Sequence, residues 1–309
     1  MMTTKAKLIT SDDPKGRQAT DLFRGAYNKA GLSDEKAQRL NENREGKFTD
    51  GLAKLIMECS ATGLYANQVV VPNYTYPGKF QRKPEELQIK ILAKELKLDP
   101  RMALDYLKKI KGRPSILPSG CHPEDGNFAI VSPFADLSMT ATGLKDSFDL
   151  ELNCKALLHL LKIISTKMHL VNYRNGRIDA YHLRQTERTL SAHRTLANEQ
   201  GESPIWIIPA QLGFLHKGEP VSIAHKNFEG NEFGLGSVDG TSIAITHPER
   251  FNEFGMDLPG DKFSPGANGI FTECPCLSSD VGRLEFCTRV IIGPSDDFGS
   301  ATGFLSQPI

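Results

Sequence analysis

The chain has few of the features that mark specialised protein classes. Among 309 residues there are six cysteines and one tryptophan, and the 37 basic side chains are matched by 37 acidic ones. Six cysteines are too few for a disulfide-scaffolded secreted domain, so we expect reduced thiols and a cytoplasmic location. No apolar run reaches the roughly 18 residues that a membrane-spanning helix needs, and we expect no membrane partner. The first ten residues lack an apolar core, so no secretory signal is expected there.

The zero net charge conceals a strong segregation along the chain. Residues 1–110 carry a net charge of +6, residues 155–195 carry +6, and residues 228–309 carry −8. Blocks of this kind favour directed electrostatic contacts. A basic surface could bind nucleic acid, an acidic partner, or the acidic end of a second copy, and the charge pattern leaves these three open.

Composition and patterning predict an α+β fold, with a helical N-terminal region followed by helices packed on a small, mainly antiparallel sheet. An apolar content of 39% is typical of globular proteins, so we expect a folded chain. The predicted parts are a flexible arm over 1–16, a helical domain over 17–110, a linker rich in proline and glycine over 111–137, and an α+β domain over 138–309.

Two helices and several strands are predicted in the second half of the chain. Apolar residues at three- and four-residue spacing predict an amphipathic helix over 152–168. Asp179 is expected to cap a second helix that runs to about residue 197. Short apolar runs separated by glycine and proline predict strands at 205–210, 242–246 and 284–292.

Residues 92–107 resemble a helix-turn-helix, with small or apolar residues where two helices would cross. Lys97 stands where glycine is usual, so it would have to adopt a left-handed conformation. Lys108 and Lys109 would follow on the second helix and could contact phosphates. The alternative interpretation is a plain helical hairpin, and the sequence does not separate the two.

The basic block at residues 155–195 supplies the main nucleic-acid contacts that we predict. Arg184 and Arg188 are expected one turn apart on the second helix, with Arg177 just before it and Arg174 in the preceding loop. Guanidinium groups at that spacing can bind phosphates. The alternative is a solvated helix face with local ion pairs.

Three polar residues in the glycine-rich half are candidates for general acid–base chemistry: His247, Glu232 and Asp261. No nucleophile elbow, zinc-protease motif or phosphate-binding loop accompanies them, so whether the protein is an enzyme stays open. The glycines of residues 230–236 have the wrong spacing for a dinucleotide fingerprint, and we predict no cofactor. A tight loop that lets backbone approach backbone is the better interpretation.

The cysteines do not complete a metal site. Cys274 and Cys276 flank a proline, and Cys287 is the only further cysteine near them. Zinc needs four nitrogen or sulfur ligands, so we predict no metal and interpret these residues as buried thiols in strands.

Several later motifs carry a resemblance to known sequences. They are Asn172-Tyr173-Arg174 with Leu183-Arg184, Pro209-Ala210-Gln211 with Gly213, His216 and Gly218, Asn231 to Gly236, His247-Pro248-Glu249-Arg250, Gly260-Asp261 with Ser264-Pro265, and Gly299-Ser300-Ala301 with Gly303-Phe304-Leu305. On these motifs, residues 172–307 resemble an uncharacterised family of hypothetical proteins from candidate-phylum bacteria. The resemblance implies no activity and no catalytic residue.

These observations favour a non-enzymatic nucleic-acid-binding protein that uses basic helices. The first alternative is a self-assembling structural protein, in which basic and acidic regions of successive copies meet head to tail. The second alternative is a hydrolase or transferase with its site in residues 211–261.

Overall fold

The computed structural model describes residues 14–42, 48–49, 51–52, 68–133, 135, 150–280 and 282–306. The chain divides into two compact units, Met1–Gly51 and Leu52–Ile309. The described residues of the first unit include the helices α1 (Pro14–Lys29) and α2 (Asp34–Asn41). The predicted arm over 1–16 lies outside the described residues except for its last three, which begin α1.

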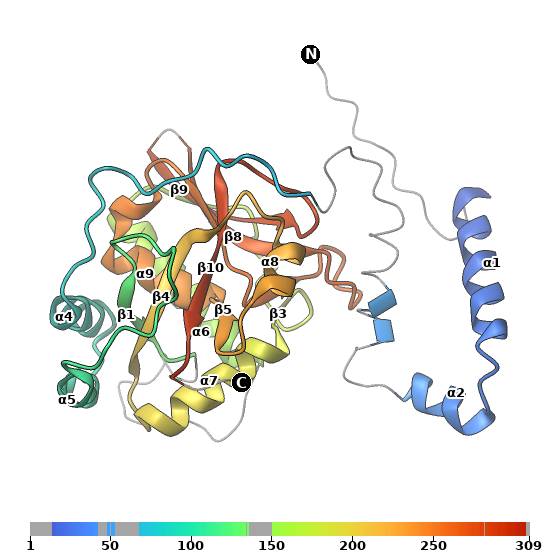
Figure 1. Cartoon of the computed structure of the whole chain (residues 1–309), viewed down its shortest axis with the longest axis horizontal. Helices are drawn as coiled ribbons and strands as arrows, with labels where there is room; N and C mark the ends of the chain where they lie inside the picture. The colour runs from blue at the N-terminus through green and yellow to red at the C-terminus, as the bar shows by residue number, and fades with distance from the viewer. Residues whose placement is uncertain are drawn as a thin grey trace, which may run out of the picture. The chain divides into compact units, whose positions relative to one another are not determined.

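The second unit is an α+β fold built on a ten-stranded, mainly antiparallel sheet (Figure 1). The main path of the sheet is β1-β4-β10-β6-β8-β7-β3, with β5 also paired to β10 and β9 joining β2 to β8. The strands are β1 (Gly126–Val131), β2 (Leu170–Asn172), β3 (Leu183–Gln185), β4 (Ile205–Lys217), β5 (Glu232–Gly234), β6 (Gly255–Asp257), β7 (Asp261–Phe263), β8 (Glu273–Asp280), β9 (Arg283–Val290) and β10 (Phe298–Phe304). The predicted α+β class is confirmed.

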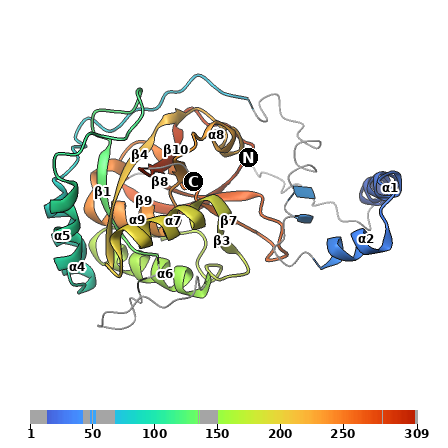
Figure 2. The same ribbon diagram turned by 60° about the horizontal axis from the view of Figure 1, so that its bottom comes forward.

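Helices cover this sheet, and one of them is enclosed. The helices of the second unit are α4 (Glu85–Leu96), α5 (Arg101–Ile110), α6 (Leu150–Lys167), α7 (Glu187–Gln200), α8 (Val221–Asn227), α9 (Ser237–Thr246) and the 3₁₀ helix η1 (Pro248–Phe251). Figures 1 and 2 show α4 and α5 side by side next to β1. Every residue of α9 is buried, because β1 and α4 pack against it as well as α6. The amphipathic helix predicted over 152–168 is confirmed as α6.

The run at 242–246 was predicted as a strand and is part of the helix α9, so that prediction is wrong. A helix buried on all sides shows no apolar stripe, and its sequence cannot be told from that of a buried strand. Two hydroxyl groups of α9 are satisfied within the helix: Thr241 Oγ1 donates to the Ser237 carbonyl (2.6 Å) and Ser242 Oγ to the Val238 carbonyl (2.7 Å). The other two predicted runs are confirmed in β4 and β9.

The structure divides the chain at residue 51, whereas the sequence analysis placed a domain boundary after residue 110 and a linker over 111–137. Ile89 and Leu92 of α4 are fully buried in the same core as β1 and β4. α4 contacts β1, and α5 contacts β4. The hairpin therefore belongs to the sheet-containing unit, and β1 lies inside the predicted linker because its apolar residues pair with β4.

A close backbone crossing joins β4 to β10. The register between the two strands shifts at Ser300, and Gly213 of β4 has φ +104°, a conformation that favours glycine. The side chain of Gln211 holds this bulge, because its Oε1 accepts a hydrogen bond from the Gly213 amide (2.7 Å). A Cβ on Gly299 would overlap the Gly213 carbonyl, so both positions require glycine.

Candidate functional site

The helical hairpin of α4 and α5 has clear local signals. Glu85 and Glu86 lie in the first turn of α4, where the helix dipole favours negative charge. Lys97 ends α4 in a left-handed conformation with φ 56°, and its amide bonds to the Ala93 carbonyl. Lys97 thus adopts the left-handed conformation that a helix-turn-helix would require there, and residues 92–107 form a helical hairpin packed on the sheet.

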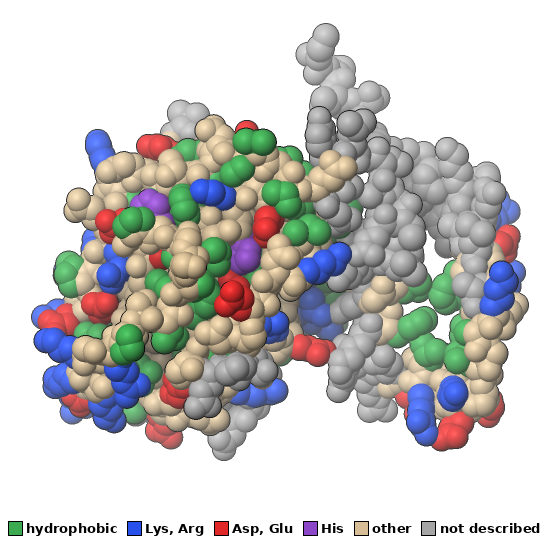
Figure 3. Space-filling view, in the orientation of Figure 1, with side chains coloured by type: hydrophobic (Ala, Val, Ile, Leu, Met, Phe, Trp, Pro, Cys, Tyr) green, Lys and Arg blue, Asp and Glu red, His purple; other side chains and the backbone are tan. Residues whose placement is uncertain are grey.

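Six exposed cationic side chains on this hairpin and the segment after it form what we call the basic surface. They are Lys90, Lys94, Lys97, Lys109, Lys111 and Arg113. None of the six forms an ion pair with a described carboxylate: four of the hairpin's five acids pair with other cations, and the fifth, Glu86, is exposed and forms no ion pair with a described cation. These pairs are Glu85–Arg82, Glu95–Lys167, Asp99–Arg101 and Asp105–Lys108. Figure 3 shows Lys and Arg side chains gathered over α4 and α5. Positive charge is therefore left unneutralised at this place.

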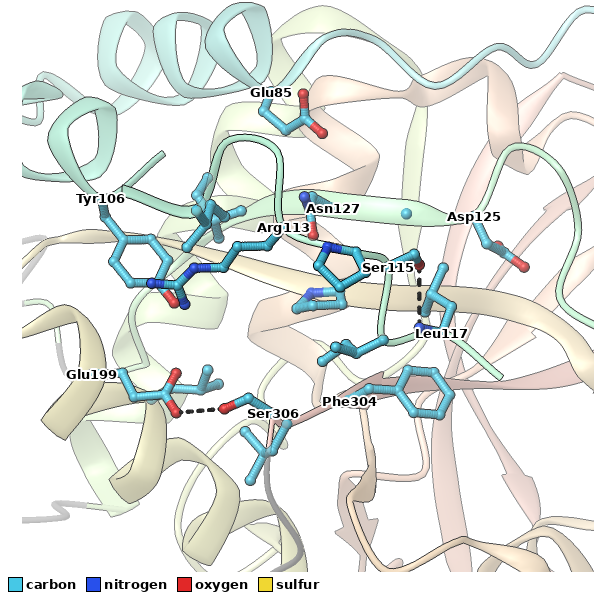
Figure 4. Close-up of a pocket in the computed structure, with 18 of the residues that line it drawn as sticks. Glu85, Tyr106, Arg113, Ser115, Leu117, Asp125, Asn127, Glu199, Phe304 and Ser306 are labelled. Carbon is cyan, nitrogen blue, oxygen red and sulfur yellow. Dashed lines mark hydrogen bonds between the residues drawn. The ribbon is translucent and has the colours of Figure 1, made fainter. Parts of the chain in front are cut away.

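A pocket of about 600 Å³ adjoins the basic surface and shares Lys109 and Arg113 with it (Figure 4). Its walls come from α5 and the segment after it, from β1 and β4, from α7, and from the end of β10. Inside it, the Ser306 hydroxyl donates to the Glu199 carboxylate (3.1 Å). Burial and the nearby Glu199 carboxylate raise the pKa of Tyr106. The pocket thus combines polar groups with apolar walls, as small-ligand sites do.

The four arginines predicted to contact nucleic acid lie on different elements. The helix predicted from about residue 180 begins only at Glu187, after Thr186 caps it, and Leu183–Gln185 form β3 instead. Arg184 is therefore on a strand and Arg188 on a helix, so the predicted one-turn spacing on a single helix is wrong. Pairing of β3 with β7 overrides the helical pattern there.

Three of these four guanidinium groups are held by the protein itself. The contacts are Arg174 to the Glu273 carboxylate (3.4 Å), Arg184 to the Ala180 carbonyl (3.0 Å) and Arg188 to the Glu232 carbonyl (2.6 Å). Arg177 is exposed and forms no ion pair with a described carboxylate. The structure thus brings Lys109 into the basic surface and places Lys108 beside it, but engages Arg174, Arg184 and Arg188 elsewhere.

The three catalytic candidates are not brought together. His247 follows the C-terminal end of α9, whereas Asp261 accepts a hydrogen bond from the Ser237 amide (2.7 Å) at the N-terminal end. The helix has ten residues and is therefore about 15 Å long. Glu232 bonds instead to His216 (2.8 Å). No common cleft contains the three side chains.

His247 itself is a buried structural residue. Its Nε2 accepts a hydrogen bond from the Lys83 amide (3.0 Å), and Thr246 Oγ1 lies 2.8 Å from Nδ1. Because Nε2 accepts, Nδ1 carries the proton in the neutral ring. Burial, together with the positive charges of Lys83 and Arg82, lowers the pKa of His247 to about 3.

A buried cluster surrounds His216 on β4. Its Nδ1 lies 3.0 Å from Glu219 and its Nε2 lies 2.8 Å from Glu232. Burial lowers the pKa of His216, but the two carboxylates outweigh it and raise the pKa to about 9. The Thr302 hydroxyl donates to Glu232 (2.6 Å) and accepts from Gln211 (2.9 Å). His216 is therefore a doubly paired imidazolium within the core.

The substitution His216→Gln should destabilise the protein most below neutral pH. The folded-state pKa of about 9 lies above the value near 6.5 expected in the unfolded chain. The stabilisation is therefore fully present below about pH 6.5 and is lost as pH rises through 9. The difference between these two pKa values corresponds to roughly 3 kcal/mol of unfolding free energy. Urea unfolding of both proteins across this pH range measures it.

His159→Gln on α6, where no described carboxylate pairs with the histidine, is the matched control for the general effect of replacing a histidine. A loss of stability that is equal at about pH 6 and about pH 10 would contradict an ionised His216.

Sequence reasoning missed a second buried cluster at the N-terminal end of α9. The Gly236 amide donates to Asp239 (2.7 Å), and His193 Nε2 lies 3.3 Å from the same carboxylate. Asp261 accepts from the Ser237 amide, and burial raises the pKa of Asp261 to about 6. Both carboxylates cap the helix, where free amides favour negative charge. The available signal was Asp239 three residues after the loop glycine.

The acidic block of the sequence is partly internal. Four of the twelve acids in residues 228–309 are buried: Glu232, Asp239, Asp257 and Asp261. The charge segregation on the surface is therefore weaker than the sequence suggests.

The cysteines of β8 and β9 are joined. Cys276 and Cys287 face each other in the antiparallel register with Cα atoms 5.2 Å apart, and they form a disulfide. The expectation of reduced thiols is therefore wrong for this pair, because strand pairing places them opposite each other. Cys274 is a buried free thiol. Among the described residues, no group of three or more His, Cys, Asp or Glu could hold a metal ion.

Comparisons with protein-family models, with curated proteins and with solved structures find no match to this chain. No helix in the part of the chain that the structure describes is both long and apolar enough to cross a membrane. The hairpin and the pocket beside it are therefore the features from which we infer a function.

Proposed function

We propose that this protein binds nucleic acid through the basic surface. The observation that carries the proposal is that its six exposed cations lack a carboxylate partner among the described residues. Phosphates would supply the missing negative charge, and each neutralised phosphate releases condensed counterions. Lys109, predicted from the sequence, belongs to this surface, and Lys108 borders it.

We propose that the protein binds nucleic acid and catalyses no reaction on it. Arg174, Arg184 and Arg188 are engaged by carboxylate or carbonyl groups, so we assign them to holding the fold. The candidate catalytic residues His247 and Asp261 lie at opposite ends of α9. The hairpin, in contrast, offers charge that no neighbouring group uses.

Binding should be salt-dependent and should require the hairpin. We expect a fluorescein-labelled 12-nucleotide strand to bind at 50 mM salt and to dissociate as salt rises, measured by fluorescence anisotropy. The double substitution Lys94→Glu/Lys111→Glu should weaken binding about tenfold or more at 100 mM salt, because it removes two phosphate contacts and adds two repelling charges.

The matched control is Lys162→Glu/Lys226→Glu, which makes the same change in net charge on the exposed faces of α6 and α8. It should change affinity by about twofold or less at this ionic strength. Equal weakening by both variants, or an isotherm that does not change with salt, would overturn the hairpin as the binding surface.

A further inference from the structure

The pocket beside the basic surface has a size that phosphate contacts do not explain. Its volume of about 600 Å³ falls in the range of roughly 300–1,000 Å³ that small-ligand sites occupy. Phosphates bound along an exposed helical hairpin need no pocket. The residues that line this pocket indicate which kind of ligand it would bind.

The carboxylates that line the pocket are all engaged. Their contacts are Glu85 to Arg82 (3.0 Å), Glu199 to Ser306 (3.1 Å) and Asp125 to Tyr76 (2.5 Å). Burial raises the pKa of Asp125 to about 6, and its carboxylate also accepts hydrogen bonds from the His122 amide (2.7 Å) and the Leu212 amide (3.2 Å). Lys109 and Arg113, in contrast, form no ion pair with a described carboxylate. The pocket is therefore open to an anionic group on the side that joins the basic surface.

An aromatic ring and an amide complete the lining. Tyr106 of α5 is half-buried and lines the pocket, Phe304 of β10 is almost fully buried in its wall, and Asn127 of β1 adds an amide (Figure 4). The positive charge of Arg113 acts on the Tyr106 hydroxyl, and Figure 4 shows the Arg113 side chain extending toward that ring. A ring, a guanidinium group and an amide together suit a planar, hydrogen-bonding, negatively charged ligand.

We propose that the pocket takes one unpaired nucleotide of a bound single strand. The base would stack on Tyr106 with its polar edge toward Asn127, and the phosphate would lie on Lys109 and Arg113. This inference rests on the proposed function and extends it, because it assigns the protein to single-stranded or unpaired nucleic acid. A base inside a duplex is already stacked and could not enter.

The following experiment distinguishes the contribution of the pocket to binding from that of the basic surface. Anisotropy is measured with a labelled 12-nucleotide single strand and with the matching blunt duplex, and binding of nucleoside 5′-monophosphates is measured by calorimetry. Tyr106→Leu keeps an apolar side chain but removes the ring, and should weaken single-strand binding about tenfold while leaving the duplex unaffected. Tyr106→Phe keeps the ring and should bind within about twofold of the original.

A second measurement does not depend on how well the variants fold. Photocrosslinking of the unmodified protein to a 5-iodouridine strand should label Tyr106, and label confined to residues outside the pocket would overturn the base in the pocket. Equal single-strand binding by Tyr106→Leu and Tyr106→Phe would also overturn it, while loss of affinity in Lys94→Glu/Lys111→Glu would still support the proposed function. A further outcome is that monophosphates bind in a way that depends on Tyr106 while neither oligonucleotide binds. That result would support a nucleotide site in the pocket but would overturn the proposed function.

Discussion

Replacing Arg250 with alanine should lower the free energy of unfolding by about 3–5 kcal/mol. Arg250 is fully buried, and its guanidinium group donates to the Leu212 carbonyl (2.5 Å) and to the Tyr74 hydroxyl. The group also lies 4.5 Å from the centre of the Tyr76 ring. Removing it leaves a large cavity and takes a positive charge away from the buried Asp125 carboxyl.

The loss reaches beyond one side chain, because Arg250 joins three separate parts of the chain. Tyr74 and Tyr76 belong to the segment before α4, Leu212 belongs to β4, and Arg250 lies in η1. The Tyr74 hydroxyl itself donates to the Leu212 carbonyl (2.6 Å), so the network is shared. Breaking one member therefore weakens the attachment of the other two.

Chemical unfolding in urea measures this prediction. Arg250→Met fills most of the volume without the charge and should lose less than Arg250→Ala, because cavity formation is then avoided. Arg101→Ala, at an exposed pair with Asp99, is the control and should change stability little. If Arg250→Ala unfolds at the same urea concentration as Arg101→Ala, the buried network contributes nothing.

Gly299→Ala should cost about 4 kcal/mol or more, or prevent folding altogether. A methyl group at this position would overlap the carbonyl oxygen of Gly213 on the neighbouring strand. The overlapping atom is backbone, and Gly213 is held by the Gln211 side chain (2.7 Å), so it cannot move aside cheaply. The two central strands β4 and β10 would have to separate.

Gly78→Ala is the matched control, because no atom lies within 4 Å of the position its Cβ would occupy. It should fold with a thermal midpoint close to that of the original protein, whereas Gly299→Ala should show a much lower midpoint or no cooperative transition. Similar midpoints for the two variants would mean that the β4–β10 crossing can relax.

The sequence predicted elements whose signals are local. The hairpin of α4 and α5 follows from apolar stripes, acids in the first turn and prolines at its starts, all within about 30 residues. The helix α6 follows from its amphipathic pattern, and β4 and β9 from their apolar runs. In contrast, α9 and β3 could not be predicted, because enclosure on all sides and pairing with β7 depend on residues far away in the chain.

The candidate site also has a part that the sequence could predict and a part that it could not. Lys108 and Lys109 could be identified as exposed cations at the end of a predicted helix. The sequence could not show which cations stay unpaired, because partners lie far away in the chain. Glu95 pairs with Lys167, some 70 residues later, and Arg188 donates to a carbonyl of β5. The pocket likewise needs Tyr106 and Phe304, which only the packing of α5 near the end of β10 brings together.

The sequence by itself determined the α+β class, the amphipathic helix α6 and the exposed cations at the end of the hairpin, because composition and spacing act over one or two helical turns. Only the tertiary structure decided that His216 and Glu232 form a buried ion pair, that Cys276 faces Cys287, that Arg174, Arg184 and Arg188 are engaged, and that a pocket opens beside the free cations. The physical reason is that charge pairing and burial depend on which strands lie together, and strand order is set by contacts between residues distant in the chain.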